Sequence, residues 1–258
     1  MTQVIKIGGR PQADPVLGAL VAEAWVRSNG RLVVVHGGGD EVSTLQRALG
    51  SVAHFVNGRR VTTEGDIDLV RMALSGSANK RLVATLISHG LAAVGLSGED
   101  ASLIRARPMD AERLGYVGVP EDVNVSFLRH LMVGGYLPVI SPVSRDDSGM
   151  LGVSLNVNGD DAAAAIAAAL QAHDLLLVAD VPGVLRDGQV VPLLTVEDAQ
   201  TLIDDGTAVG GMRAKLQAAL AALAAGVSRV RISDLAAIAD PDRGTVVLTA
   251  SNQRERAA

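Results

Sequence analysis

The architecture of this chain follows from residues 31–39, which read Arg-Leu-Val-Val-Val-His-Gly-Gly-Gly. A short β-branched run of this kind predicts a buried strand, and the glycines predict a tight turn before a helix that extends to about Leu49. The same order occurs earlier, where Val4–Ile7 precedes two glycines. Short strands that alternate with longer amphipathic helices are typical of a mainly parallel sheet covered by helices. The sequence therefore predicts an α/β fold.

The rest of the chain continues this alternation without a break in composition, so we expect one continuous domain with two functional lobes. Residues 100–125 are expected to form a small β excursion, and Asn57-Gly58 and Asp187-Gly188 each predict a hairpin. Thr195 and Asp198 match a capping box. The remaining expected strands cover Ala92–Leu96, Leu137–Ser141, Leu151–Val157, Leu175–Ala179, Arg229–Ile232 and Thr245–Leu248, and the remaining helices cover about Pro15–Asn29, Thr63–Leu74, Asn79–His89, Ser126–Gly134, Asp160–Leu170 and Met212–Ala225.

Composition excludes several classes of function. Aromatic residues make up 2% of the 258 residues and the net charge is −5, which disfavours nucleic acid and an anionic membrane as partners. Because the chain has no cysteine, it can have no disulfide, no catalytic thiolate and no cysteine metal site. The longest apolar stretch, Ala162–Leu170, is about half of a membrane span, and the N-terminus lacks the features of a signal peptide. We therefore expect a cytoplasmic protein.

Lysine is rare in this sequence, since it occurs only at Lys6, Lys80 and Lys215, against twenty arginines. Lysine carries a compact point charge on a flexible stem, whereas arginine presents a planar fork suited to bidentate pairing. A point charge beside two glycines suggests contact with phosphate oxygens in a confined site. Chance survival of three lysines is the alternative that composition alone leaves open.

The two glycine-rich turns point in the same direction. Glycine lets the backbone approach a ligand closely, and the N-terminus of a following helix offers free N–H groups and the positive end of its dipole. Two such turns at the carboxyl ends of strands place two anion-binding loops on one edge of the sheet, where α/β proteins bind ligands. Each turn alone could be a tight connection that needs glycine. Neither matches the P-loop or the dinucleotide-binding fingerprint, which disfavours a P-loop ATPase and a dehydrogenase.

Three further segments combine polar residues with turns. Arg59 and Arg60 follow a predicted hairpin turn, and one of them could bind a carboxylate through two parallel hydrogen bonds or lie on a solvated edge. Residues 156–161, Asn-Val-Asn-Gly-Asp-Asp, precede an apolar helix, which they could cap, or they could bind a ligand and orient a lysine. Asp180–Leu185 follow a strand and could wrap a nucleotide or form a plain turn.

Eight motifs occur in one order along the chain, from Val4 to about Val247. They are Lys-x-Gly-Gly at 6–9, His-Gly-Gly-Gly at 36–39, Gly-x-Arg-Val-Thr at 58–62, Ala-Asn-Lys at 78–80, Gly-Tyr-Leu-Pro-Val at 135–139, Asn-Val-Asn-x-Asp at 156–160, Asp-Val-x-Gly-Val-Leu at 180–185 and Gly-Met-x-x-Lys at 211–215. In these motifs the chain resembles the N-acetylglutamate kinases of the amino acid kinase family. The resemblance implies a single domain over residues 1–258, folded as a three-layer α/β/α sandwich with a mostly parallel central sheet of about eight strands.

The resemblance also implies a phosphotransferase with a carboxyl group as acceptor. The reaction would be ATP-dependent phosphorylation of the γ-carboxylate of N-acetyl-L-glutamate to N-acetylglutamyl 5-phosphate, the second step of arginine biosynthesis. The lobe of about residues 1–155 would bind the acyl amino acid, and that of about residues 156–250 would bind ATP with Mg²⁺. No residue of the chain is implied as a metal ligand.

By the same resemblance, Lys6 and Lys215 would neutralise the phosphoryl group in transit, and Asp160 would orient both lysines. Lys80 would have a structural role. The residues implied in substrate binding are Gly38, Gly39, Arg60 and Asn156. The implied ATP contacts are Gly8, Gly9, Asp180, Val181, Pro182, Gly183, Val184, Leu185, Thr207, Ala208 and Val209.

The sequence departs from the family pattern at two positions, because residue 59 is Arg where Leu is usual and residue 159 is Gly where Ala is usual. Arg59 doubles the positive charge beside the acceptor site. A kinase acting on aminoadipate or glutamate linked to an acidic carrier protein, in lysine biosynthesis, is therefore the nearest rival function. The net negative charge and the Gly-x-Arg-Val-Thr motif favour the free acyl amino acid.

A non-catalytic amino-acid sensor on the same fold is a second rival, since fold does not fix function. The intact set of Lys6, Asp160 and Lys215 argues against it. The chain begins at its first strand and lacks the N-terminal helix that links dimers into hexamers in arginine-inhibited relatives. We therefore expect a homodimer that arginine does not strongly inhibit.

Overall fold

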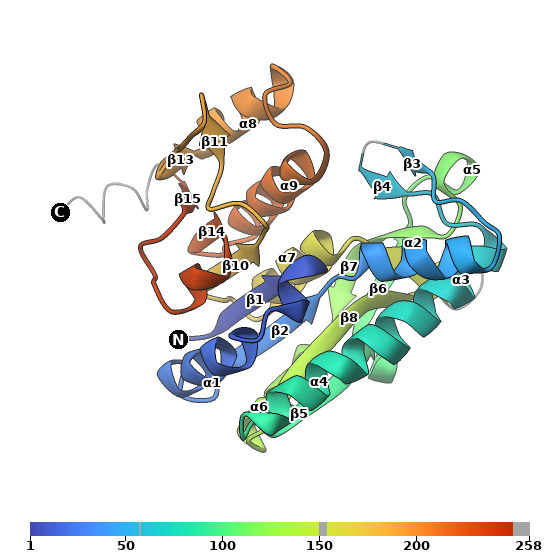
Figure 1. Ribbon diagram of the computed structural model, residues 1–258, viewed down its shortest axis with the longest axis horizontal. Helices are drawn as coiled ribbons and strands as arrows, with labels where there is room; N and C mark the ends of the chain where they lie inside the picture. Colours follow the sequence, from blue (N-terminus) through green and yellow to red (C-terminus); the bar gives the residue numbers. More distant parts are fainter. Residues whose placement is uncertain (57, 150–153, 250–258) are drawn as a thin grey trace.

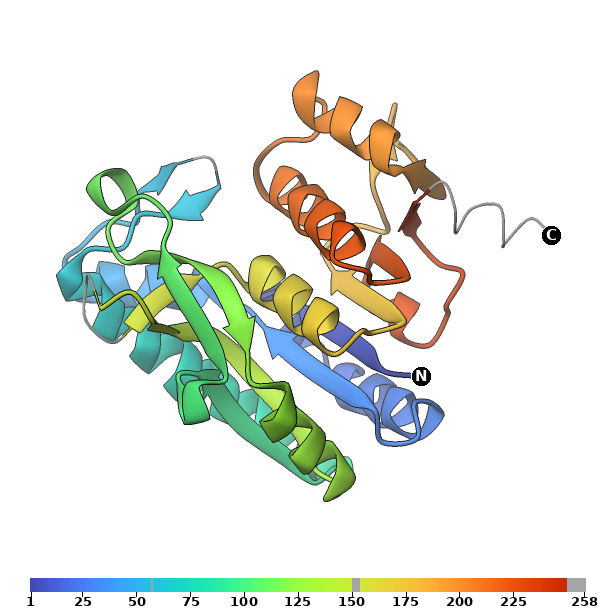
Figure 2. The same ribbon diagram turned by 180° about the vertical axis from the view of Figure 1, so that it is seen from behind.

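The computed structural model describes residues 1–56, 58–149 and 154–249, and Figures 1 and 2 show the chain from opposite sides. Within these ranges the central feature is a mixed sheet of eleven strands, in which parallel pairs outnumber antiparallel ones. In order across the sheet the strands are β13 (Leu193–Thr195), β15 (Thr245–Leu248), β14 (Arg229–Ser233), β10 (Asp174–Val178), β1 (Gln3–Ile7), β2 (Leu32–His36), β8 (Leu137–Asp146), β6 (Ile104–Pro108), β7 (Val117–Val123) and β9 (Ser154–Val157), with β5 (Ala93–Gly98) paired to β8.

Helices connect these strands, and two small hairpins stand apart from the main sheet. No helix in the described part of the chain is long and apolar enough to cross a membrane. The α-helices are α1 (Leu17–Arg27), α2 (Gly39–Ala48), α3 (Glu64–Arg71), α4 (Asn79–Ser88), α5 (Ala111–Leu114), α6 (Val125–Val133), α7 (Gly159–Ala169), α8 (Val196–Asp204) and α9 (Gly210–Ala224), the 3₁₀ segments are η1 (Arg10–Ala13), η3 (Asp100–Ser102) and η4 (Leu235–Ile238), the π-helical segment is η2 (Met72–Ala78), and the hairpins pair β3 (Phe55–Val56) with β4 (Arg59–Arg60) and β11 (Leu185–Arg186) with β12 (Gln189–Val190).

Helices cover both faces of the sheet because successive strand residues point to opposite sides. In β10, Leu175 and Leu177 belong to the hydrophobic core under α7 and α9, whereas Leu176 and Val178 belong to the core under α1 and α4. Figure 1 shows α1, α2, α3 and α4 in front of the sheet, and Figure 2 shows α6, α7 and α9 on the other side. The structure therefore confirms the expected three-layer α/β/α sandwich.

The sheet is wider than the eight or so strands that were expected. β6 and β7, predicted as a separate excursion, pair with each other and join β8 and β9. The cause is β8, which continues past its predicted end at Ser141 to Asp146 and so offers backbone groups to β6 and β9. The predicted strand Leu151–Val157 is seen from Ser154, and residues 151–153 lie outside the described ranges.

A second difference lies between Thr63 and His89, where two separate helices were predicted. α3, η2 and α4 instead form one unbroken helical run. A π-helical turn takes in extra residues without ending the helix, and here η2 takes in residues 75–78, which lie between the two predicted helices. The run leaves Leu74 and Asn79 buried.

The two ends of the molecule hold different parts of the chain. Figure 1 shows the strands β10 to β15 with α8 and α9 at one end, the hairpin β3–β4 with α2 and α3 at the other, and β1 and α7 between them. α7 and α9 pack side by side, and buried alanines of both helices, such as Ala167 and Ala218, lie in one core cluster. α7 therefore lies between the two ends of the molecule.

Candidate active site

Two lysines and one aspartate meet where β1, α7 and α9 come together. Lys6 lies near the end of β1 and points to the α7 side because Val4, two residues earlier, belongs to the core on that side. Its Nζ is 2.9 Å from Oδ1 of Asp160, in the first turn of α7. Lys215, in the second turn of α9, places its Nζ 3.1 Å and 3.2 Å from Oδ1 and Oδ2 of the same carboxylate. The fold thus joins two ammonium groups from opposite ends of the sequence.

The three side chains are largely shielded from solvent, with relative exposures of 9% for Lys6, 6% for Asp160 and 12% for Lys215. Burial alone would raise the pKa of Asp160, but the two ammonium groups outweigh it and lower this pKa to about 2. Burial lowers the pKa of Lys215 to about 8, although Asp160 opposes the change. With two lysines against one carboxylate, the cluster offers net positive charge to an anion.

A crevice of about 230 Å³ opens beside this cluster. The backbone of Gly38, which lines it, has φ +150, and a Cβ there would lie 2.8 Å from Cδ2 of Leu74, so any larger residue would be strained. Gly39 begins α2, which directs the positive end of the helix dipole toward the crevice. The predicted site residues among its lining are Lys6, Gly9, Gly38, Gly39, Arg60, Asn156 and Asp160.

Gln12 joins the two glycine-rich turns, and the sequence analysis missed it. Its Nε2 donates to the carbonyl oxygens of Gly8 at 3.1 Å and Gly37 at 2.9 Å. The turns abut, since a Cβ on Gly9 would lie 3.5 Å from the Cα of Gly38. A single glutamine in a short helical turn has no distinctive spacing, so no signal in the sequence marks it.

Arg60 is buried at the edge of the crevice and is held by α2. Its Nη2 donates to the carbonyl of Gly39 at 2.7 Å and to Oγ of Ser43 at 2.8 Å, and its Nη1 donates to Oε1 of Gln46 at 2.5 Å. A guanidinium has five N–H donors, so two remain for a ligand. The Arg60 guanidinium also lies 4.8 Å from the centroid of the Phe55 ring. These contacts fix the position of Arg60 and leave two of its N–H donors for a ligand.

Asn79, from the Ala-Asn-Lys motif, is a buried connector behind the second glycine-rich turn. Its Nδ2 donates to Nε2 of His36 at 3.0 Å and to the carbonyl of Val139 at 2.9 Å. Lys80 donates from Nζ to Oδ1 of Asn79 at 3.1 Å and to the carbonyl of Gly95 at 2.9 Å. These contacts agree with the structural role expected of Lys80.

His36 also has both ring nitrogens engaged, since Nδ1 donates to the carbonyl of Gly37 at 2.8 Å while Nε2 accepts from Asn79. Burial lowers the pKa of His36 to about 4, so the ring is neutral near pH 7. The histidine therefore shapes the turn and has no free nitrogen to act as a base.

The segment before α7 divides its two expected roles between different residues. Asn158 caps the helix, because its side chain accepts from the backbone N–H of Asp160 at 2.8 Å. Asp160 contacts both lysines. Asn156 lines the crevice and donates from Nδ2 to Oγ1 of Thr62 at 2.9 Å. The same short segment thus begins a helix and supplies the site.

The residues expected to bind ATP lie mostly in the C-terminal half. Asp180–Leu185 follow β10, where the N–H of Val184 donates to Oγ1 of Thr245 at 2.8 Å. Thr207–Val209 lead into α9, the helix that carries Lys215. Among the described residues, neither segment lines the crevice. Within the same ranges, no group of three or more histidine, aspartate or glutamate side chains could hold a metal ion.

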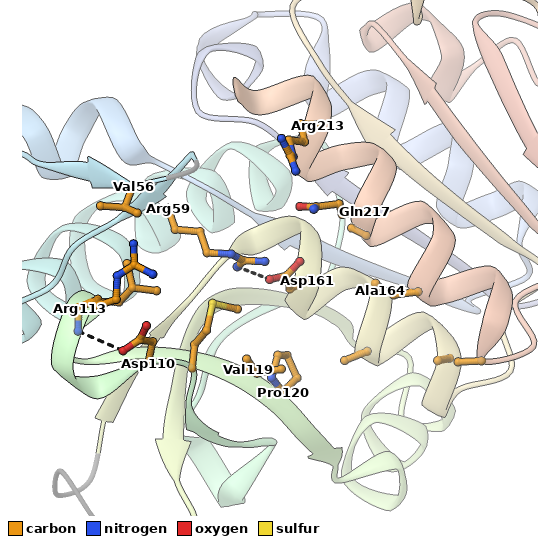
Figure 3. A pocket seen from close by; sticks show the side chains of 17 residues that line it. Val56, Arg59, Asp110, Arg113, Val119, Pro120, Asp161, Ala164, Arg213 and Gln217 are labelled. Atoms are coloured by element: carbon orange, nitrogen blue, oxygen red, sulfur yellow. Dashed lines mark hydrogen bonds and ion pairs between the residues drawn. The ribbon is translucent and has the colours of Figure 1, made fainter. Parts of the chain in front are cut away.

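Arg59 was predicted to add a second positive charge beside the acceptor site, and it lines the crevice next to Arg60. Its Nη1 also lies 2.5 Å from Oδ2 of Asp161 on α7. Figure 3 shows the two side chains facing each other. The carboxylate of Asp161 thus offsets the charge of Arg59. The sequence alone could not predict this pair, because the two residues are brought together only by the fold.

Comparison with known proteins agrees with this arrangement. Residues 1–234 match the amino acid kinase family. The chain is 44% identical over 233 residues to an acetylglutamate kinase of Geobacillus stearothermophilus, covering 90% of this chain and 89% of that one. It is 44% identical over 240 residues to that of Chloroflexus aurantiacus, covering 92% and 93%. Among solved structures, smu.665 from Streptococcus mutans UA159 superimposes with a TM-score of 0.86 at 30% identity, over 96% of this chain and 98% of that one.

Proposed function

The chain belongs to the amino acid kinase family, and on this premise we propose that it phosphorylates the γ-carboxylate of N-acetyl-L-glutamate with ATP. Two acetylglutamate kinases that match nearly the whole chain support this choice of substrates. The product would be N-acetylglutamyl 5-phosphate, and the reaction would serve arginine biosynthesis in the cytoplasm. The contact of Lys6 and Lys215 with one carboxylate, beside two glycine-rich turns, is the observation that carries the proposal.

Phosphoryl transfer to a carboxylate brings two anions together, so it needs positioning and charge neutralisation more than covalent help. At an effective dielectric constant of about 20, a charge pair ~4 Å apart is worth about 4 kcal/mol. Lys6 and Lys215 would supply such pairs to the migrating phosphoryl group, and Asp160 would hold both ammonium groups between turnovers. The acceptor carboxylate is ionised near neutral pH, so no general base is required.

The surrounding residues suit the two substrates. Arg60 has two free N–H donors for the α-carboxylate of the acceptor, and Asn156 lies on the same crevice. The lobe of about residues 1–155 would therefore bind the acyl amino acid. The lobe of about residues 156–250, with Asp180–Leu185 and Thr207–Val209, would bind ATP.

Mg²⁺ would enter the site on the phosphates of ATP. Asp160 already accepts hydrogen bonds from two lysines, so we infer that it does not coordinate the Mg²⁺ ion. Mg²⁺ usually keeps several waters and binds substrate phosphates rather than a cage of protein ligands. When bound, the ion would neutralise charge on the phosphates.

The pairing of Arg59 bears on the rival acceptor. A carrier-linked aminoadipate was favoured only by the extra positive charge of Arg59, and that charge is paired with Asp161. The free acyl amino acid is therefore the better-supported acceptor.

We also propose a homodimer. In the described part of the chain β5 pairs with β8 on one side only, and Val133 and Tyr136 are exposed near the start of β8. A free sheet edge beside exposed apolar side chains is a common protein–protein contact surface. Sedimentation velocity should give a dimer, and a monomer or hexamer would exclude it.

An ADP-release assay with trapping of the acyl phosphate by hydroxylamine tests the function. We expect turnover with N-acetyl-L-glutamate and little with glutamate, aspartate, carbamate or UMP. Activity on one of the other acceptors, or on none, would reject the proposal.

Variants test the lysines. Lys6→Ala and Lys215→Ala should each lower turnover on the order of 10²–10³, by analogy with removal of one transition-state donor. Lys80→Ala is the matched control, because Lys80 donates hydrogen bonds to Asn79 and Gly95 and is not among the described residues that line the crevice. Its turnover should stay within a few-fold of the wild type. Near-normal turnover in either of the first two variants would reject their role.

A further inference from the structure

Three consecutive residues of the hairpin β3–β4 contact three helices. A Cβ on Gly58 would lie 3.3 Å from the carbonyl oxygen of Gly210, at the start of α9. Arg59 pairs with Asp161 on α7, and Arg60 donates to Gly39 at the start of α2. Because neighbouring strand residues point to opposite faces, the two arginines serve opposite sides of the hairpin. The hairpin thus connects the helices that carry the catalytic cluster to the helix beside the acceptor crevice.

Backbone pairing with the other described strands gives the hairpin little support. β3 and β4 pair only with each other among the described strands, apart from a single bridge between Thr62 and Gly115 just beyond β4. A two-stranded hairpin is at best marginally stable alone. Its position over the crevice therefore depends on side-chain contacts.

The Arg59–Asp161 pair is well placed for this purpose. The relative exposures of its side chains are 17% and 16%, far below those of the ion pairs on the surface. Figure 3 shows Arg59 reaching from the hairpin toward Asp161 on α7. Both residues line a groove of about 710 Å³, together with Ala164, Ala168 and Ala221. Burial raises the pKa of Asp161 although Arg59 opposes the change. Loss of either partner would leave the other poorly solvated.

We propose that the Arg59–Asp161 ion pair is a latch that holds the hairpin against α7, which makes Arg59 a positioning residue for the acceptor. The inference rests on the proposed function, because Arg59 and Arg60 both line the acceptor crevice. Contacts with α2 hold the hairpin on the side of Arg60, and the pair with Asp161 holds it on the side of α7. Lys6, Asp160 and Lys215 are held by β1, α7 and α9, so they keep their places when the hairpin moves. The latch should therefore affect acceptor binding and leave ATP binding unchanged.

Kinetics of Arg59→Met, Asp161→Asn and the double variant test the latch. Each single variant should raise KM for N-acetyl-L-glutamate by about 3- to 30-fold, and the double variant should raise it no further, as expected of coupled neighbours. Both kcat and KM for ATP should stay within two-fold of the wild type. Arg59→Lys, which keeps the charge, should restore most of the acceptor affinity.

A matched control is the exposed pair of Arg105 and Asp122, which joins β6 to β7 in the same lobe. Arg105→Met and Asp122→Asn should leave all three kinetic constants unchanged. An unaltered acceptor KM in Arg59→Met, or effects of the two latch variants that multiply in the double variant, would overturn the latch.

Hydrogen exchange gives a readout that does not depend on activity. The N–H of Val61 donates to the carbonyl of His54 at 2.9 Å and closes the hairpin. This amide should exchange about tenfold faster in Arg59→Met and unchanged in Arg105→Met, because loosening the hairpin opens it locally. Equal protection in all three proteins would refute the latch. If the wild-type chain does not phosphorylate N-acetyl-L-glutamate, the proposed function fails, while exchange at Val61 still decides whether the latch exists.

Discussion

Replacement of Lys215 by methionine should make the protein more stable while it removes phosphoryl transfer. The pKa of Lys215 falls from 10.5 to about 8 in the folded protein, with burial as the main cause. Each pKa unit corresponds to about 1.4 kcal/mol, so folding with the charged side chain costs about 3 kcal/mol at neutral pH. This value already includes the attraction of Asp160. Methionine has a similar unbranched stem and no charge to desolvate.

The sign of the pH dependence follows from a folded-state pKa that is lower than the unfolded-state pKa. Below about pH 8 lysine is charged in both states, and the full cost is present. As the pH rises to 10.5 the folded state releases its proton first, so the cost disappears and the wild type gains stability. The advantage of Lys215→Met should therefore be about 3 kcal/mol at pH 7 and much smaller at pH 10.

Urea unfolding at both pH values measures this difference through the midpoint and slope. At pH 7 the melting temperature should rise by roughly 6–12 °C, given 2–4 °C per kcal/mol for a chain of this size. Arg47→Met is the control, since Arg47 is exposed and forms no ion pair with the described residues, and it should change the free energy of unfolding by no more than about 0.5 kcal/mol. A Lys215→Met protein that is no more stable than the wild type at pH 7, or whose advantage persists at pH 10, would refute the reasoning.

Three further results are expected. Asp160→Asn should lower the free energy of unfolding by about 2 kcal/mol at pH 7, because folding lowers the pKa of Asp160 from 3.8 to about 2. This contribution to stability is present above pH 3.8 and is lost as the pH falls through about 2. Urea unfolding at pH 7 and pH 3 would measure it. Turnover should fall about tenfold per pH unit above pH 8 as Lys215 loses its proton, and Lys215→Arg should move this limb upward in a pH–rate profile, so an unmoved limb would assign it elsewhere. Gly95→Ala should cost about 1–3 kcal/mol in thermal unfolding, since its Cβ would lie 2.1 Å from Oδ1 of Asn79, whereas Gly76→Ala, with open space around it, should be tolerated.

Much of the fold could be predicted because its signals are local. The apolar runs of β1, β2 and β10 are buried on both faces, and such runs indicate buried strands from the sequence alone. The hairpin turn at Asp187-Gly188 could be predicted from its two residues, and both have positive φ between β11 and β12. The width of the sheet was not local, because β6 and β9 join only where the extension of β8 meets them.

Some residues of the candidate site could likewise be predicted from local sequence, and others could not. Lys6, Asp160 and Lys215 stand in short motifs that share an order with a known family, so they could be named before their contacts were seen. Gln12 and the Arg59–Asp161 pair could not, because each depends on partners that the fold brings together across the chain. The identity of residue 59 was visible in the sequence, but the direction of its side chain required the hairpin and α7 to be placed in space.

The packing of α7 against α9 has a consequence for which substitutions this chain can accept. The distance between packed helices depends on the size of the side chains between them. Asp160 is attached to one helix and Lys215 to the other, and both helices carry several buried alanines, so small side chains keep the reacting charges close together. A bulkier residue at one of these alanines would move the ammonium and carboxylate groups apart, although every reacting group would remain chemically intact. Such a substitution could impair the reaction from a position far from the reacting groups.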